Sequence, residues 1–156
     1  MHQKPLVLIL CTGNSCRSQM AEAFLRRDHG DRYEVVSAGT EPKAQVHPLA
    51  VRVMKEIGLD IGGQRPKPVS DFLGSRPVTH LLVVCDKAHE TCPRTWPGVY
   101  TRDFVPFDDP AAATGSEEDV LAAFLRVRDE IGEAMRAWTP HVERPGAAPA
   151  HPPAQR

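Results

Sequence analysis

The sequence predicts a single α/β domain of three layers (α/β/α), with helices on both faces of a four-stranded parallel sheet. Two short runs, Leu6–Leu10 and His80–Val84, are continuous and, apart from His80, apolar, as expected of strands buried on both faces of such a sheet. Helical patterns separate the strand candidates, and this alternation favours parallel strands joined by right-handed crossovers. A chain of 156 residues suits one domain, which we place at residues 1–140.

Two strand–helix units make up the first half of the chain. In order, we expect a strand over Leu6–Leu10, a helix over Ser18–Arg27, a strand over Tyr33–Ser37 and a helix over Pro48–Ile57. Gly30 and Gly58 follow the two helices, as glycines that end helices do. The second helix carries an apolar stripe at four-residue spacing, formed by Leu49, Val53 and Ile57.

The second half contains the strand over His80–Val84 and a long final helix. Two prolines limit Gly62–Leu73 to one short helix, Asp86–Pro97 is predicted as a polar loop, and a fourth strand is expected within Val99–Phe107. Ser116 and Asp119 then form a helix-capping signature. The apolar face of this last helix comprises Val120, Phe124, Val127, Ile131, Met135 and Trp138.

The composition is that of an ordinary globular protein. A formal net charge of −1 gives no overall attraction for nucleic acid or anionic membranes, and no basic segment suited to reading DNA occurs. The run Leu6–Leu10 is too short to cross a membrane, and the N-terminus has no signal-peptide pattern. We therefore expect a cytoplasmic location and neither a membrane nor a nucleic-acid partner. Residues 141–156 are rich in proline and alanine without periodicity, which predicts a disordered tail.

The segment Cys11–Ser18 predicts a site for a tetrahedral oxyanion. It follows a buried strand and opens a helix, where backbone N–H groups and the positive helix end can converge on an anion. Arg17 can hold two anion oxygens in a planar fork. The same positive field is expected to lower the pKa of Cys11 and make it the nucleophile. The residues expected to bind the anion are Thr12, Gly13, Asn14, Ser15, Cys16, Arg17 and Ser18.

Three polar side chains are expected to assist this nucleophile. Ser18 can hydrogen-bond the Cys11 thiolate, and Asn14 can hold the shape of the loop through side-chain bonds or a left-handed backbone. Asp109, which precedes a proline, can give a proton to a leaving oxygen. Asp108 is the competing candidate, and a plain turn is the alternative for both, because Asp-Pro is a frequent turn dipeptide.

The remaining cysteines suggest redox chemistry. Four cysteines are too few for a disulfide scaffold in a chain of this length. Cys85 follows a predicted strand and can reach Cys11 at the same rim of the sheet, so thiol–disulfide exchange can pass an oxidation from Cys11 to Cys85 and on to Cys92. The alternatives are that both later cysteines are passive, or that they form a zinc site with His89. That set lacks an obvious fourth ligand, and we predict no metal.

Five motifs occur together in this chain: Cys11–Glu22, Val36–Thr40, Cys85-x6-Cys92-Pro93, Phe107–Ala111 and Val127–Ile131. As a set they resemble the motifs of bacterial arsenate reductases built on the low-molecular-weight tyrosine phosphatase fold. The resemblance covers nearly everything from Leu6 to Trp138.

The resemblance implies reduction of arsenate to arsenite by a relay of three cysteines, in the service of arsenic detoxification. Cys11 would attack arsenate held by the loop and Arg17, and Asp109 would protonate the departing oxygen. Cys85 would then attack Cys11 and release arsenite, and Cys92 would attack Cys85. Thioredoxin or a similar thiol reductant would reduce the resulting disulfide, and no cofactor is implied.

One segment departs from the family pattern. Some family members bind potassium beside the loop through an Asn, a Glu, a Ser and an Asp, and Asn14, Glu22 and Ser37 match the first three. The segment that would carry the Asp contains Lys67 instead. We therefore expect a lysine in place of a bound cation and do not predict potassium binding.

Two other functions compete with arsenate reduction. A low-molecular-weight phosphatase would hydrolyse phosphate monoesters through a Cys11 phospho-enzyme, but it would have no use for Cys85 and Cys92. It would also favour aromatic walls around its site, and the chain has two tyrosines, Tyr33 and Tyr100. A redox-sensing or metal-binding regulator, in which the thiols respond rather than turn over, is the other alternative.

Overall fold

The computed structural model describes residues 4–72, 77–91 and 99–140, and it contains the predicted parallel sheet of four strands. The strands are β1 (Leu6–Cys11), β2 (Glu34–Gly39), β3 (His80–Val83) and β4 (Thr101–Phe104). They pair in the order β2-β1-β3-β4, and each of these pairings is parallel. The α/β fold class predicted from the sequence is confirmed.

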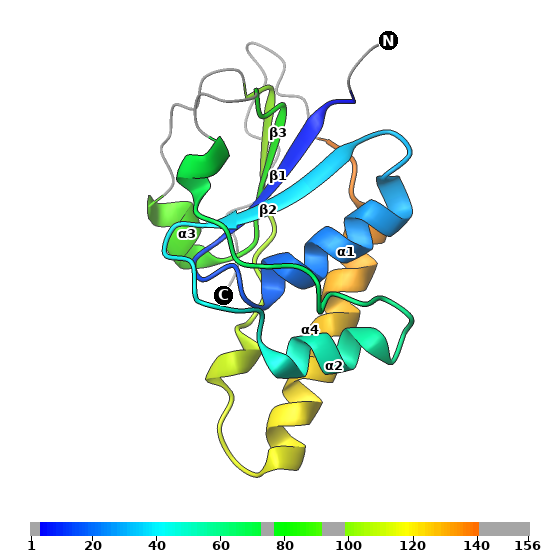
Figure 1. Ribbon diagram of the computed structural model, residues 1–156, viewed down its shortest axis with the longest axis vertical. Helices are drawn as coiled ribbons and strands as arrows, with labels where there is room; N and C mark the ends of the chain where they lie inside the picture. The colour runs from blue at the N-terminus through cyan, green and yellow to red at the C-terminus, as the bar shows by residue number, and fades with distance from the viewer. Residues whose placement is uncertain (1–3, 73–76, 92–98, 141–156) are drawn as a thin grey trace.

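Helices flank the sheet on two sides. They are α1 (Arg17–His29), α2 (Pro48–Lys55), α3 (Asp86–Thr91) and α4 (Glu117–Ala137), with short 3-10 turns η1 (Val69–Phe72) and η2 (Pro110–Ala112). Figure 1 shows α1, α2 and α4 gathered on one side of the sheet and α3 on the other. The sheet is therefore the middle of three layers.

The strand order determines where a ligand can bind. From β1 the chain moves outward to β2, and from β3 it moves outward to β4, so the direction of travel reverses between the two central strands. In parallel sheets, ligands bind beyond the carboxyl ends of the strands at such a reversal. Strand β1 ends at Cys11, and Cys85 comes two residues after the end of β3. Both thiols therefore lie at this point of the sheet rim.

The burial of the strands accounts for their sequence patterns. Every residue of β1 and β3 is buried, because these strands are central in the sheet and helices cover both of its faces. The edge strand β4 alternates between buried and half-buried residues. In this sheet, a continuous apolar run is typical of a central strand, and an alternation of buried and half-buried residues is typical of the edge strand β4.

Helix α4 supplies much of the core on the α1 side. It begins with the predicted capping box, in which Asp119 N donates to Ser116 Oγ and Ser116 N donates to Asp119 Oδ2, both at 3.1 Å. Gly132 allows α1 to approach closely, because a Cβ at this position would lie 3.1 Å from the Phe24 ring. The buried residues of the helix are Phe124, Val127, Ile131 and Met135.

The helix predicted over Pro48–Ile57 ends earlier than expected, at Lys55. Gly58 has a φ of +82° and reverses the chain after the helix. Ile57 therefore falls in the turn and is 40% exposed, so its predicted place on the apolar stripe is wrong. The residues of α2 that are buried are Ala50, Val53 and Met54.

The segment predicted as a polar loop, Asp86–Pro97, begins with helix α3. No glycine or proline interrupts the chain between Asp86 and Thr91, and the Asp86 carboxylate suits the positive N-terminal end of a helix. Ala88 is fully buried, whereas the residues on either side of it are exposed. Among the helix residues whose burial is described, Ala88 is the one that points inward, and one inward residue leaves no periodic pattern from which to predict a helix.

Two predictions concern segments that lie outside the described residues. These segments are residues 92–98, which include Cys92, and the tail at 141–156. The disordered tail and the domain limit at residue 140 therefore stay predictions.

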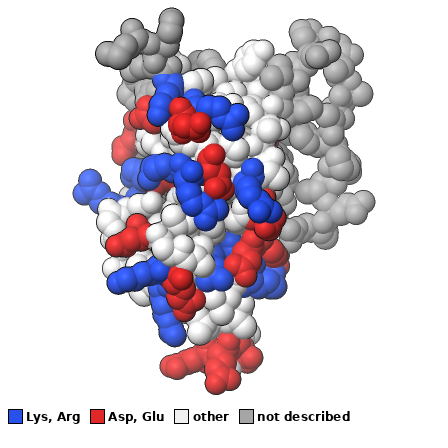
Figure 2. Space-filling model, turned by 90° about the vertical axis from the view of Figure 1, so that its right-hand side faces the viewer, with Lys and Arg blue, Asp and Glu red and all other residues white. Residues whose placement is uncertain are grey.

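The described surface carries mixed charge. On the face drawn in Figure 2, lysines and arginines are interspersed with acidic side chains rather than gathered into one basic area. Ion pairs such as Arg128–Glu56, at 3.4 Å, are consistent with this mixture. None of the helices in the described part of the chain has the length and apolar character to cross a membrane.

Phe124→Ala should lower the free energy of unfolding by about 3–5 kcal/mol, because this fully buried ring is lost and a cavity remains between α4 and its neighbours. Urea unfolding followed by circular dichroism measures the change. The control is Tyr100→Ala, since Tyr100 is 63% exposed and should change stability by less than about 0.5 kcal/mol. Equal losses in the two variants would contradict the assignment of Phe124 to the core.

Candidate active site

The loop between β1 and α1 is shaped by Asn14. Its backbone has a φ of 49°, and no other non-glycine residue in the described part of the chain has a positive φ. Asparagine tolerates this left-handed conformation better than most residues. The fully buried side chain donates from Nδ2 to Ser18 Oγ at 2.8 Å and to Ser37 Oγ at 2.9 Å, and its Oδ1 accepts from Lys67 N at 2.9 Å. Both of the features expected of Asn14 are therefore present.

The loop encloses a cavity of about 580 Å³ at the sheet rim. Helix α1 begins at Arg17 with Cys16 as its N-cap, and no side chain caps it. The first backbone N–H groups of α1 are thus available to an anion in the cavity. The predicted site residues that line the cavity are Cys11, Thr12, Gly13, Asn14, Ser15, Cys16, Arg17, Cys85 and Asp109.

Arg17 lines this cavity, and contacts of both terminal nitrogens orient its guanidinium group. Its NH1 group donates to Phe107 O at 3.1 Å, and NH2 lies 3.8 Å from Asp109 Oδ2. The Nε–H group is buried and forms no hydrogen bond with the residues described. A buried donor without a partner costs free energy, so an oxyanion that accepts from Nε would relieve that cost.

Asp109 and Asp108 differ in what they contact. Asp109 caps η2 through Oδ1, which accepts from Ala111 N at 3.0 Å, and its Oδ2 faces Arg17. Asp108 Oδ2 instead accepts from NH1 of Arg126 at 3.3 Å. Both aspartates line the cavity, but Asp109 is the one that lies beside Arg17, the residue expected to bind the anion. The geometry thus favours Asp109 over Asp108 as a proton donor.

Cys11 and Cys85 form a hydrogen-bonded pair of free thiols. Both are buried, and the sulfur of Cys85 also lies 3.2 Å from the Thr12 hydroxyl. The hydrogen bond from Cys11 lowers the pKa of Cys85 to about 5, and Thr12 and the backbone N–H of Ala88 add to this effect against the cost of burial. One negative charge on the pair is therefore stable at neutral pH.

The position of that charge differs from the sequence-based expectation. The hydrogen bond to Cys85 raises the pKa of Cys11 well above its usual value, burial raises it further, and Arg17 opposes both. The expected lowering of the Cys11 pKa does not hold in the anion-free site, because the hydrogen bond with Cys85 and burial together raise it. The partner thiol was not included in that prediction.

Cys16 and Ser18 lie within or behind the loop. Burial raises the pKa of Cys16 to about 12, so its thiol is protonated and is no competing nucleophile. Ser18 is fully buried, and its hydroxyl accepts the hydrogen bond from Asn14. A hydrogen bond from Ser18 to the Cys11 thiolate stays a prediction.

One member of the alternative zinc site, Cys92, lies outside the described residues. Of its other members, Cys85 is engaged with Cys11 and Thr12, and the His89 ring stacks on Phe104 with centroids 4.0 Å apart. No group of three or more His, Cys, Asp and Glu side chains suited to a metal occurs in the part of the chain that is described.

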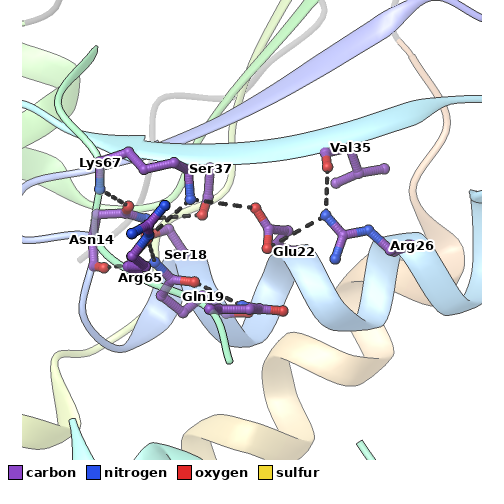
Figure 3. Close-up of polar contacts among 10 residues, drawn as sticks. Asn14, Ser18, Gln19, Glu22, Arg26, Val35, Ser37, Arg65 and Lys67 are labelled. Atoms are coloured by element: carbon purple, nitrogen blue, oxygen red, sulfur yellow. Dashed lines mark hydrogen bonds and ion pairs between the residues drawn. The ribbon is translucent and has the colours of Figure 1, made fainter. Parts of the chain in front are cut away.

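Lys67 occupies the place beside Glu22 (Figure 3). The Glu22 carboxylate is buried on α1, with Lys67 Nζ at 4.0 Å from Oε1 and Arg26 NH2 at 3.5 Å from Oε2. Lys67 Nζ also donates to Arg65 O at 3.0 Å. Burial lowers the pKa of Lys67, and Glu22 opposes this shift. The lysine that we expected at the cation position therefore has its ammonium group at the matching carboxylate.

Sequence reasoning missed several supporting contacts. Phe107 O orients Arg17, and Gln19 Nε2 ties the loop to the neighbouring segment by donating to Asn14 O at 2.9 Å and to Arg65 O at 3.0 Å. A carbonyl group carries no side-chain signal, so the first was invisible. The second had a weak signal, since a glutamine follows the loop directly on the helix.

The chain is similar in sequence to known proteins. The sequence pattern of the low molecular weight phosphotyrosine protein phosphatases matches residues 6–148. An arsenate reductase of Bacillus subtilis (strain 168) is 44% identical over 137 residues, which cover 87% of this chain and 96% of that protein. An arsenate reductase of Halalkalibacterium halodurans is 43% identical over 135 residues, covering 86% of this chain and 95% of its own.

Solved structures have a similar fold. An arsenate reductase in its phosphate-binding state superposes with a TM-score of 0.70 at 30% identity, covering 84% of this chain and 93% of that one. A tyrosine phosphatase of Erwinia amylovora also reaches a TM-score of 0.70, at 21% identity, and covers 87% of this chain and 91% of its own. The latter likeness concerns the fold alone.

The reduced protein should show ultraviolet thiolate absorbance with a midpoint close to pH 5, the pKa of Cys85. The signal should be present above that pH and disappear as the pH falls through it. Cys11→Ser should move the midpoint to higher pH, because the hydrogen bond from Cys11 is the largest cause of the shift. Cys16→Ser is the matched control and should leave the midpoint unchanged. A midpoint near the ordinary thiol value in the unsubstituted protein would refute the paired-thiol assignment.

Lys67→Met should lower the free energy of unfolding by about 1–2 kcal/mol, because it removes one of the two cations beside the buried Glu22. The backbone hydrogen bond from Lys67 N to Asn14 is unaffected by this change. Urea unfolding of the single variants and of Glu22→Gln/Lys67→Met gives the coupling free energy, expected at about 1 kcal/mol. Additive effects would show that the two side chains do not interact.

Proposed function

The chain belongs to the low molecular weight phosphotyrosine protein phosphatase family, and within it we propose that the protein is an arsenate reductase that uses Cys11 as its nucleophile. The observation that carries the proposal is the pairing of Cys11 with a second buried thiol, Cys85, at one oxyanion cavity. Hydrolysis of a phosphate ester needs one thiolate, whereas reduction needs two thiols that can form a disulfide.

Binding of arsenate would use the loop as a ready-made anion site. Three oxygens would accept hydrogen bonds from the loop and α1 backbone and from the unused Nε–H of Arg17. As the Cys11 sulfur attacks arsenic, its proton passes along the existing hydrogen bond to the Cys85 thiolate. An S–As bond forms, and the arsenate hydroxyl group that leaves takes a proton from Asp109 and departs as water.

The second step moves electrons to arsenic. Cys85 gives its proton to an oxygen of the arsenic group bound to Cys11, and the Thr12 hydroxyl and the Ala88 N–H stabilise the resulting thiolate. Its sulfur then attacks Cys11, an S–S bond forms, and the S–As bond breaks with its electron pair retained by arsenic. Arsenic goes from the pentavalent to the trivalent state and leaves as arsenite, and the two thiols are oxidised to a disulfide.

Recycling of the enzyme completes the proposal. Cys92 would attack Cys85, which frees Cys11 as a thiolate and moves the disulfide to Cys85 and Cys92. The dithiol of thioredoxin or of a similar protein would then reduce this disulfide. We place this activity in the cytoplasm, in the service of arsenic detoxification. Support for the relay comes from the spacing of the cysteines in the sequence and from the relatives named arsenate reductases.

Phosphatase activity is the second candidate and shares the same cradle. A Cys11 phospho-enzyme would form by the same attack, with Asp109 protonating the ester oxygen. The described residues that line the cavity include one aromatic side chain, Phe107, and a rim of charged groups. An aryl ester would find little apolar surface there, so we propose hydrolysis as a weak side activity.

Cys85→Ser should abolish arsenate-dependent oxidation of NADPH in the presence of thioredoxin and thioredoxin reductase, because the S–As bond can no longer be reduced. The same variant should keep measurable hydrolysis of p-nitrophenyl phosphate, since Cys11 and Arg17 are intact. Cys92→Ser should release about one arsenite per enzyme and then stop. Sustained arsenate turnover by Cys85→Ser would refute the relay, and fast aryl phosphate hydrolysis without arsenate reduction in the unsubstituted protein would refute the reductase assignment.

A further inference from the structure

The rim of the cavity holds charged side chains, and most of them are already paired. Glu41 accepts from Lys87 Nζ at 3.1 Å, and Asp108 accepts from Arg126 at 3.3 Å. Lys43 also lines the cavity, but its ammonium group forms no hydrogen bond or ion pair with any residue in the described ranges 4–72, 77–91 and 99–140. Lys43 therefore offers a positive charge at the rim that no residue within the described ranges neutralises.

The position of Lys43 is fixed by the anion loop itself. Its backbone N–H donates to Gly13 O at 2.9 Å. Its aliphatic stem lies along the loop, because a Cβ on Gly13 would be 3.3 Å from both Cγ and Cε of Lys43 and 3.4 Å from Cδ. A stem that is laid along the loop loses less rotamer entropy when its ammonium group binds a ligand.

The charge of Lys43 affects groups in and around the oxyanion cavity. Together with Arg17, it works against the burial that raises the pKa of Cys16, and it adds to the burial that lowers the pKa of His47. Cys16 is the last residue before α1 and lines the same cavity. An anion in the cradle would therefore lie within the field of Lys43 as well as that of Arg17.

We propose that Lys43 is a specificity-determining residue that binds the outermost oxygen of a small inorganic oxyanion. This inference rests on the proposed function and adds a substrate preference to it. A tetrahedral anion with three oxygens in the loop directs its fourth oxygen to the rim. In arsenate or phosphate that oxygen is charged or a hydroxyl, so it can accept a hydrogen bond from an ammonium group.

A phosphate ester would present a different group to the same place. Its fourth oxygen carries carbon and bears little charge, so it is a poor partner for Lys43. The organic group would also have to displace the Lys43 stem or the ion pair between Lys87 and Glu41. Lys43 thus favours unsubstituted oxyanions over esters by attraction of the former and obstruction of the latter.

The test compares Lys43→Met with the unsubstituted protein in two assays that do not depend on each other. Calorimetric titration of the reduced protein with inorganic phosphate should give a dissociation constant about 5- to 10-fold higher for Lys43→Met, the scale of one partly exposed charged contact. With arsenate and thioredoxin, KM should rise by a similar factor while kcat stays within about 2-fold. For p-nitrophenyl phosphate, kcat/KM should stay the same or increase.

Two control variants define the effect. Lys43→Arg should keep the phosphate affinity, because the charge is retained. Lys55→Met removes a lysine of similar exposure at the end of α2, away from the cavity, and should leave every value unchanged. Since Lys43 is exposed, none of these changes endangers folding, and thermal unfolding checks this directly.

An unchanged dissociation constant for phosphate in Lys43→Met would overturn the proposal. Equal losses for phosphate and for the aryl ester would overturn it as well, because Lys43 would then attract anions without distinguishing them. The phosphate titration requires no turnover. A protein that fails to reduce arsenate but loses phosphate affinity on Lys43→Met would therefore refute the proposed function and leave the assignment of Lys43 intact.

Discussion

The buried amide of Asn14 fixes the shape of the loop on which the whole site depends. A left-handed conformation costs a non-glycine residue roughly 1–2 kcal/mol, and here three hydrogen bonds of the side chain offset it. These bonds reach α1, β2 and the segment that carries Lys67. The loop can therefore keep its N–H groups directed at one small volume without an anion to organise them.

The second organising feature is the reversal of strand order between β1 and β3. It brings Cys11 and Cys85, which are distant in sequence, to neighbouring strand ends. Since both sulfurs are buried, they share one proton rather than ionising separately. Nucleophile and resolving thiol therefore cannot be described one at a time, because the pKa of each is set mainly by the other.

The sequence was sufficient to predict the parallel sheet and the loop. Continuous apolar runs identified β1 and β3, and the contacts of Asn14 and the position of Asp109 agree with expectation. The predictions for residues 86–91 and for Ile57 were wrong, because the local sequence pattern did not reveal the interaction that determines the structure there. Helix α3 is anchored by one buried alanine, and Ile57 follows a helix spacing that Gly58 interrupts.

The electrostatics of the site could not be predicted for a related reason. A positive loop lowers the pKa of an isolated thiol, but here the largest contribution for Cys11 comes from a residue on another strand. Likewise, Lys43 became distinctive only when the partners of its neighbours were known. An interaction between residues on different strands can be recognised only when their positions in space are known. The hydrogen bonds within one loop can be predicted in part from the types of residue in that loop.

The thiolate of Cys85 has a consequence for the durability of the protein. Thiolates are the forms that peroxide and electrophiles attack, so a cysteine with a pKa of about 5 would ordinarily be the first to be damaged in a stressed cell. Cys85 exposes 2% of its surface and is hydrogen-bonded to Cys11 and Thr12. Because Cys85 also lines the oxyanion cavity, access through that cavity as well as ionisation governs its reactivity.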